Sequence, residues 1–165
     1  MTKLLNNSTA RSQADDYLNT PSSGPYCALL ILDLDNFKQI NDTYGHLFGD
    51  KILLKAAQAI KSSFRDRDIM ARFGGDEFMV LMKDISNPEV IKDRCEKMLF
   101  TFHSLLEEYG VQEITGFSIG ISLSPLHATS YEQLFKCADA AMYETKKIGK
   151  NNFSIYQPAE PVYYY

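Results

Sequence analysis

Residues 71–82 read ARFGGDEFMVLM, and the question is why two glycines are followed directly by two carboxylates, Asp76 and Glu77, between apolar runs. A Gly-Gly pair suits a tight two-residue hairpin, so we predict strands at about 68–73 and 77–82 joined at the glycine pair. Two acids at the start of a strand can simply be solvent-exposed residues at the edge of a sheet. They can also belong to a metal site, and that interpretation needs further ligands elsewhere in the chain.

A second group of acids ends the most apolar run of the chain, CALLILDL at residues 27–34. A nearly continuous apolar run is typical of a strand buried on both faces. Asp33 and Asp35 should point to the same face because side chains alternate along a strand. If this strand is central and the hairpin runs beside it, Asp33, Asp76 and Glu77 converge at one edge of the sheet.

The remaining periodicity predicts the order strand, helix, strand hairpin, helix, strand, helix, strand. This order favours an α+β fold with a ferredoxin-like (βαββαβ) antiparallel sheet and helices packed on one side. We expect a single domain at residues 1–156, followed by a tail at 157–165. Helical spacing and capping signals predict helices at about 8–18, 50–64, 88–109 and 131–148, and apolar runs predict further strands at about 113–123 and 153–156.

Composition narrows the class of protein and its location. The chain has 165 residues, 45% of them apolar, and a net charge of −4, which argues against non-specific binding to DNA. No apolar run approaches the roughly 18–20 residues of a membrane span. Cys27, Cys95 and Cys137 lie far apart without CxxC spacing, so we expect buried free thiols in a reducing compartment. The sequence predicts a cytoplasmic protein with no membrane segment in this stretch.

The proposed acidic cluster has the chemistry of a hard-cation site. Carboxylate oxygens without histidine or thiolate suit Mg²⁺ or Mn²⁺. Mg²⁺ usually binds one or two carboxylates together with phosphate oxygens, so the small number of ligands favours a nucleotide. Two metal ions on shared carboxylates would serve an in-line displacement at phosphorus.

With RFGGDEF at residues 72–78 and DLDNFKQINDTYGHLFGD at 33–50, the chain resembles the GGDEF domain, the catalytic domain of diguanylate cyclases. The resemblance extends from TKLLNNSTAR near the start to YETKKIGKNNFSIY near the end, with several blocks in the same order and at the same distances. It implies a fold of the nucleotide-cyclase or polymerase-palm type. It also implies the condensation of two GTP molecules into cyclic di-GMP and two pyrophosphates. Two protomers face each other in a transient homodimer, and each 3′-hydroxyl attacks the α-phosphate held by the other protomer.

The resemblance also implies roles for particular residues. An amide and a carboxylate suit recognition of the guanine edge, because together they donate to and accept from it. Lysines can neutralise the triphosphate, although a lysine at the C-terminal end of a helix is also stabilised by the helix dipole. The implied catalytic residues are Asp76, Glu77 and Asp33; the metal ligands are Asp33, the Leu34 carbonyl, Asp76 and Glu77; the guanine readers are Asn41 and Asp50; and the other GTP contacts are Phe37, Lys38, Gly74, Gly75, Lys146 and Lys150.

Arg65 and Asp68, in RDRD, match the RxxD inhibitory site of the family in their spacing to Gly74. The resemblance implies that the arginine grips the guanine and phosphate of the product cyclic di-GMP and that the aspartate accepts from guanine N–H groups. Arg/Asp pairs on a loop are also common as plain surface charge. We expect product inhibition at this site.

The resemblance is incomplete at the N-terminus, where Asn6 and Asn7 replace the usual Asn-Arg. We expect a domain cut from a longer protein whose upstream sensory domain supplies dimerisation, so that the fragment alone can be monomeric and slow. Two alternatives to a diguanylate cyclase remain open. A catalytically silent domain that binds GTP or cyclic di-GMP is disfavoured by the intact acids, and a relative that makes cyclic GMP-AMP is disfavoured by Asp50.

Overall fold

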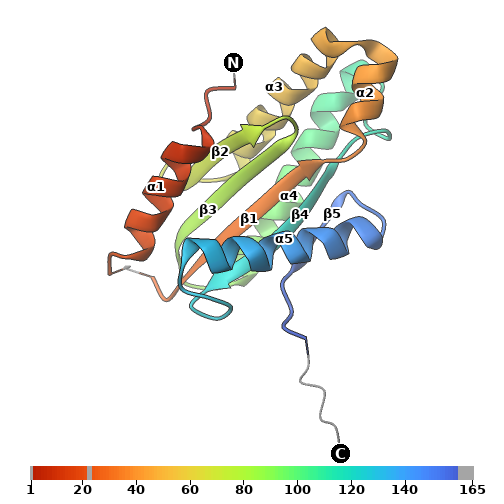
Figure 1. Cartoon of the computed structure of the whole chain (residues 1–165). Coiled ribbons are helices and arrows are strands. Elements are labelled where there is room, and N and C mark those ends of the chain that lie inside the picture. The colour runs from red at the N-terminus through yellow and green to blue at the C-terminus, as the bar shows by residue number, and fades with distance from the viewer. Residues whose placement is uncertain (1, 22–23, 160–165) are drawn as a thin grey trace, which may run out of the picture.

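The structure, a computed structural model, describes residues 2–21 and 24–159 and contains a five-stranded sheet with helices on both faces (Figure 1). Of the predicted tail, residues 157–159 have no regular secondary structure and 160–165 lie outside the described residues. Within the described part of the chain, no helix is both long and apolar enough to cross a bilayer. The strands are β1 (Tyr26–Leu34), β2 (Ile69–Gly74), β3 (Glu77–Ile85), β4 (Phe117–Ser124) and β5 (Asn152–Ile155), and the helices are α1 (Asn7–Leu18), α2 (Phe37–Tyr44), α3 (His46–Ser63), α4 (Glu89–Leu106), the short 3-10 helix η1 (Glu107–Tyr109) and α5 (Tyr131–Lys147).

The sheet has the strand order β2-β3-β1-β4-β5, with β1 at its centre. The β1–β3, β1–β4 and β2–β3 pairs are antiparallel, which confirms the predicted ferredoxin-like α+β fold. The added edge pair, β4–β5, is parallel, so the sheet is mixed rather than wholly antiparallel. Parallel neighbours need a crossover connection, and α5 provides it.

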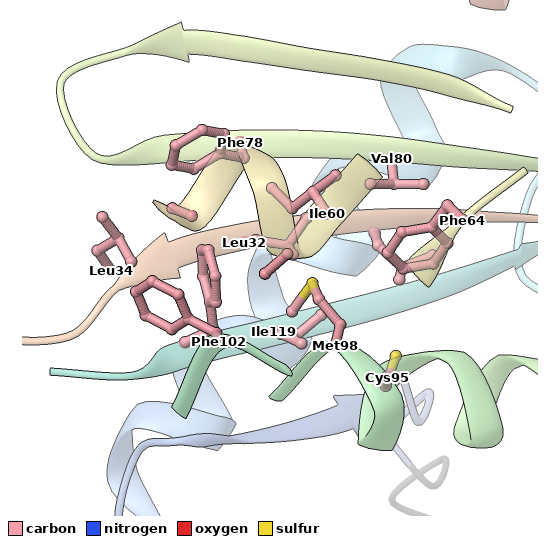
Figure 2. Close-up of a cluster of buried hydrophobic side chains, with 14 of the residues drawn as sticks. Leu32, Leu34, Ile60, Phe64, Phe78, Val80, Cys95, Met98, Phe102 and Ile119 are labelled. Carbon is pink, nitrogen blue, oxygen red and sulfur yellow. The ribbon is translucent and has the colours of Figure 1, made fainter. Parts of the chain in front are cut away.

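Helices cover both faces of the sheet, whereas the sequence led us to expect one covered face. Leu30 and Leu32 of β1 belong to a buried cluster with α3 and α4, part of which Figure 2 shows. Leu29 and Ile31 belong to a second cluster with α1 and α5. A strand that is apolar on both faces needs a covering layer on each face, because burying one such side chain contributes about 2 kcal/mol to the stability of the fold. The second layer also brings α5 to the functional end of the sheet.

The helix predicted at about residues 50–64 is α3, and the structure adds before it a helix, α2, that the sequence analysis did not predict. The first helix, α2, precedes Gly45, and α3 begins at His46. Gly45 has a φ of +85°, a left-handed conformation that separates the two helices. The sequence analysis did not predict α2, which has only eight residues and buries only Ile40.

The three cysteines are free thiols, as expected, but only two of them are buried. Burial raises the pKa of the Cys27 thiol to about 11 and that of Cys95 to about 12. Because the thiolate is the reactive form, both side chains behave as inert core residues at neutral pH. Cys137, on α5, is partly exposed, which corrects the prediction that it is buried.

Gly120 of β4 lets α5 approach the sheet closely. A Cβ atom at this position would overlap backbone atoms of Ala138 and Met142 in α5. The helix is fixed further along by Thr145, whose hydroxyl donates to the carbonyl of Ile119 at 2.9 Å. These contacts set the position of the C-terminal end of α5.

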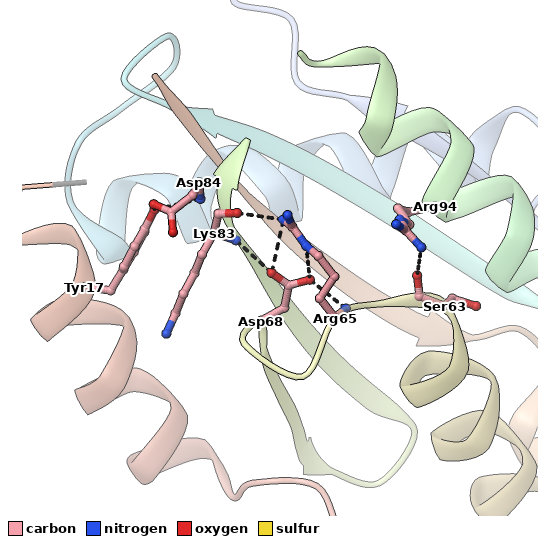
Figure 3. A network of polar contacts seen from close by, with 7 residues as sticks. All are labelled: Tyr17, Ser63, Arg65, Asp68, Lys83, Asp84 and Arg94. Atoms are coloured by element: carbon pink, nitrogen blue, oxygen red, sulfur yellow. Dashed lines mark hydrogen bonds and ion pairs between the residues drawn. The ribbon is translucent and has the colours of Figure 1, made fainter. Parts of the chain in front are cut away.

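Arg65 and Asp68 form a clasp between the α3–β2 turn and β3 (Figure 3). One carboxylate oxygen of Asp68 accepts from the Arg65 backbone N–H at 2.9 Å, and the other accepts from the Lys83 backbone N–H at 3.0 Å. The Arg65 guanidinium donates to the Lys83 carbonyl at 2.7 Å. Only 1% of the Asp68 side chain is exposed, so this carboxylate is a buried structural acceptor.

Replacing Gly120→Ala should lower the free energy of unfolding by about 3 kcal/mol, because the overlapping atoms are backbone and cannot yield as a side chain can. Gly110→Ala is the comparison, since Gly110 has a φ of +66° but open space around it. Its cost should be only about 1 kcal/mol. Urea denaturation measures the free energy of unfolding of both variants. Equal costs would contradict the close approach of α5 to β4.

Asp68→Ala should destabilise the protein by about 3 kcal/mol, since it leaves two partly buried backbone N–H groups without their acceptor. Asp68→Asn keeps one acceptor oxygen and should cost about half as much. The neighbouring exposed residue offers a control, Asp66→Ala, with an expected cost below about 0.5 kcal/mol. Chemical denaturation measures the free energy of unfolding of each variant. The clasp is refuted if Asp68→Ala is as stable as the control.

Candidate active site

The turn between β2 and β3 consists of Gly75 and Asp76, one residue later than predicted. Gly74 is the last residue of β2 and pairs with Glu77, after a register shift that begins at Arg72. The φ angles of Gly74 and Gly75 are +130° and +57°, which glycine adopts without strain. The Arg72 guanidinium donates to the Gly75 carbonyl at 2.7 and 3.1 Å and braces the turn. Asp76 therefore lies at the tip of the hairpin.

The hairpin brings the three predicted acids to one end of the sheet, next to the end of β1 (Figure 1). Asp33 of β1 is the direct cross-strand partner of Glu77 in β3. The carbonyl of Asp76 accepts from the Leu34 backbone N–H at 3.1 Å, which ties the turn to the end of β1. The predicted convergence of Asp33, Asp76 and Glu77 is therefore present in the fold.

Negative charge is crowded at this end of the sheet. Burial and, next, the charge of Asp33 raise the pKa of the Asp76 carboxyl. Burial, followed by the charges of Asp33, Asp76 and Asp139, raises the pKa of Glu77. Both shifts mean that the ionised carboxylates lack enough compensating positive charge. A bound cation would supply it.

Lys146, at the C-terminal end of α5, pairs with Asp33 at 2.5 Å. Burial by itself lowers the pKa of Lys146, but the hydrogen bond to Asp33 and the charges of Asp33, Asp35 and Asp76 outweigh it and raise the pKa. The ammonium group therefore stays charged at neutral pH. Lys150, the second predicted phosphate ligand, donates to the side-chain oxygen of Asn36 at 2.8 Å. Both lysines thus lie beside the end of β1.

The donor set fits a hard cation in the way that Mg²⁺ commonly binds. Among the residues that the structure describes, no three acids, histidines or cysteines form a complete metal cage. Asp33 and Asp76 could instead offer carboxylate oxygens at the end of the sheet, beside Leu34, with the remaining positions left to a ligand. One or two carboxylates completed by phosphate oxygens is the usual Mg²⁺ arrangement.

The predicted base-recognition residues gather around the junction of α2 and α3. Gly49 is buried in the first turn of α3, and a Cβ there would overlap the side-chain oxygen of Asn41 and press on the Phe37 ring. Both side chains therefore lie against Gly49, beside Asp50, which is exposed. The sequence reasoning missed Gly49, although an interior helix glycine is costly and signals close packing. Lys38, also on α2, is exposed.

Asp35, which was predicted only to share a face with Asp33, is buried and hydrogen-bonded within the protein. It is 5% exposed, and its carboxylate accepts from the Ser118 hydroxyl at 2.6 Å and the Asn151 backbone N–H at 2.8 Å. Ser118 is the cross-strand partner of Asp33, so Asp35 does lie on the predicted face. Both of its oxygens are already committed to donors in the protein.

The predicted inhibitory pair lies apart from these residues. Arg65 and Asp68 precede β2 at the end of the strand opposite the hairpin turn. The Arg65 side chain is 32% exposed, whereas Asp68 is buried in the clasp. A ligand could reach the arginine directly, but it would have to displace backbone N–H groups to reach the aspartate. Inhibition at this site stays a prediction.

Comparison with known proteins agrees with this arrangement. Residues 1–152 match the family model described as "Diguanylate cyclase, GGDEF domain". Among solved structures, the GGDEF domain of YfiN (TpbB) from Pseudomonas aeruginosa superposes with a TM-score of 0.83 at 28% identity, covering 96% of this chain and 99% of that one.

Two curated relatives come from Escherichia coli K12. The cyclic di-GMP phosphodiesterase PdeR is 35% identical over 159 residues, which is 96% of this chain and 24% of PdeR. The diguanylate cyclase DosC is 35% identical over 140 residues, which is 82% of this chain and 29% of DosC. The chain thus spans about a quarter of the length of the curated relatives it matches. A family model that matches nearly the whole length, on this fold, means that the chain belongs to the GGDEF domain family.

Proposed function

We propose that this domain condenses two GTP molecules into one cyclic di-GMP and two pyrophosphates. The observation that carries the proposal is the gathering of Asp33, Asp76 and Glu77 beside Lys146 at one end of the sheet. Such a site suits a metal-bound triphosphate better than a neutral ligand, because carboxylates and an ammonium group occur together. The diguanylate cyclase activity named for DosC supports the same reaction class.

In this proposal, Asp33, Asp76 and the Leu34 carbonyl would hold Mg²⁺ or Mn²⁺. When bound, the metal would neutralise phosphate charge and make the 3′-hydroxyl a better nucleophile. Lys146 and Lys150 would pair with the triphosphate, so Lys146 would exchange its contact with Asp33 for phosphate oxygens. The glycines of the turn leave the approach to the phosphates free of side chains.

Each half-reaction forms one bond between a 3′-oxygen and an α-phosphorus and breaks one bond from that phosphorus to pyrophosphate. Glu77 would accept the hydroxyl proton or assist the metal, and its raised pKa suits a proton acceptor. Phe37, Asn41 and Asp50 would hold the guanine at the α2–α3 junction. One domain binds one GTP, so the cyclic product requires two copies facing each other.

A second candidate is a domain that binds GTP or cyclic di-GMP without turnover. The observation that favours it is the likeness to PdeR, whose name describes a phosphodiesterase although the match covers nearly all of this chain. Under this candidate the acids and Lys146 would bind a ligand but the domain would signal through a partner.

The test incubates the domain with GTP and Mg²⁺ at increasing protein concentration and separates the products by chromatography with mass detection. Cyclic di-GMP should form, at a rate rising faster than protein concentration because two copies must meet. Asp76→Asn should reduce the rate at least about 100-fold, since it removes a ligand charge at the reacting centre. Asp93→Asn, on the exposed side of α4, is the matched control and should retain activity.

Slow association is separated from inactivity by fusing a dimeric coiled coil to the N-terminus. An absence of product from the fused dimer, with GTP still bound, would overturn the cyclase proposal in favour of the binding domain. A mixture of GTP and ATP tests base selectivity in the same assay. Formation of cyclic GMP-AMP as the main product would contradict the guanine-reading role given to Asp50.

A further inference from the structure

The loop from α5 to β5 has an unfavourable backbone conformation. Gly149, Lys150 and Asn151 have φ angles of +124°, +63° and +40°. Glycine tolerates such angles, but a left-handed residue with a side chain costs roughly 1–2 kcal/mol. Two successive strained residues persist only where the surroundings hold them. The position of Lys150 therefore depends on whatever fixes this loop.

Asp35 is a buried group that helps to hold the loop, together with the Lys150 backbone N–H, which donates to the Thr145 carbonyl at 3.2 Å. Its carboxylate accepts from the Asn151 backbone N–H at 2.8 Å, within the strained stretch, and from the Ser118 hydroxyl at 2.6 Å. Its own backbone N–H donates to the Gly116 carbonyl at 2.9 Å. A charge-assisted hydrogen bond to a backbone N–H, made by a buried carboxylate, is among the stronger ones in proteins. Asp35 thus joins the end of β1, the start of β4 and the loop.

The loop also fits closely against the strand ends. A Cβ at Gly116 would overlap the Asn151 side chain, so this side chain lies directly against the Gly116 backbone. Next to Asp35, Asn36 donates to the Ile114 carbonyl at 2.9 Å and accepts from the Lys150 ammonium at 2.8 Å. Lys150 is therefore held at its backbone, through the neighbouring Asn151, and at the end of its side chain.

We infer that Asp35 is a positioning residue, which holds the Lys150–Asn151 backbone so that Lys150 stands beside the phosphate end of the active site. This inference rests on the proposed function for its phosphate and on the hydrogen bonds above for its geometry. Asp35 itself is given no contact with substrate or metal, since it is 5% exposed and both oxygens accept hydrogen bonds within the protein. The second aspartate of the DLD motif thus acts through a residue 115 positions further along the chain.

The first measurement needs no nucleotide. Amide hydrogen exchange is followed over residues 149–152 in the wild type, Asp35→Asn and Asp93→Asn. Asp35→Asn should speed exchange at Asn151 at least tenfold while the amides of α3 and β3 stay protected, and Asp93→Asn should change neither. Unchanged exchange at Asn151 would overturn the inference. If Asp35→Asn does not fold, Ser118→Ala, which removes one donor to Asp35, should raise the same exchange about threefold, and no rise would refute the role.

The second measurement tests whether Asp35 acts through Lys150. Affinity for α,β-methylene GTP with Mg²⁺, an analogue whose α–β linkage resists cleavage, is measured for Asp35→Asn, Lys150→Met and the double variant. Each single change should weaken binding about tenfold, and the double variant should bind about as weakly as either one, because the two changes remove the same contact. Additive losses of about 100-fold would refute action through Lys150.

The two proposals fail in different ways. If the wild type does not bind the analogue, the proposed function is wrong, and the phosphate role of Lys150 is wrong with it. The exchange experiment still decides in that case whether Asp35 holds the loop. If the analogue binds and Asp35→Asn leaves both its affinity and the exchange at Asn151 unchanged, the positioning role alone is wrong.

Discussion

Burial of β1 on both faces is the constraint on which the rest of the structure depends. A strand with apolar side chains on each face is stable only between two layers, and α3 with α4 and α1 with α5 provide them. The first charged residue of the strand, Asp33, comes where this double burial ends, because an ionised group inside the core would lose its hydration. Period-two alternation then puts Asp33 on the α5 side, where Lys146 pairs with it. The position of the candidate site at this end of the sheet thus follows from the length of one apolar run.

The charged groups at this end of the sheet are suited to binding a ligand. Asp76 and Glu77 have raised pKa values because burial and neighbouring acids disfavour their ionised forms. Lys146 relieves part of the repulsion by pairing with Asp33. A site that holds more carboxylates than nearby cations gains from binding a cation. Under the proposed function, a metal-bound triphosphate would in turn gain from the lysines, and Lys146 would exchange Asp33 for phosphate oxygens.

Two buried carboxylates, Asp35 and Asp68, show that a motif residue need not contact a ligand. Each lies near an end of the sheet and accepts hydrogen bonds from backbone N–H groups of distant segments. The Asp68 carboxylate joins a turn to β3, and the Asp35 carboxylate stabilises a strained loop beside the site. The residue types that suit metals and guanine also suit the capture of backbone donors. Residue type alone does not distinguish these roles, whereas burial and hydrogen-bond partners do.

Prediction from the sequence succeeded where local signals were strong. The apolar run of β1, the glycine-rich hairpin and the helical apolar stripes of α4 and α5 led to the correct fold class. The prediction failed where a segment buries few side chains or where its backbone departs from regular geometry. Helix α2 buries one residue. Strand β4 begins at Phe117 rather than near residue 113, because Ile114 and Thr115 still bond to Val111 in a turn. The β2–β3 turn lies one residue later than predicted because of a bulge.

The sequence by itself determined which acids end the central strand and which follow the glycines, because strand periodicity and turn chemistry are local properties. It also determined that the acids are suited to a hard cation. Only the tertiary structure decided that Asp33 pairs with Lys146, that Asp35 holds the backbone of Asn151, and that Asp68 is buried. The first two contacts join residues more than a hundred positions apart, and burial of Asp68 requires β3 to lie against the turn. Such contacts exist only after the sheet has assembled and the helices have packed on it.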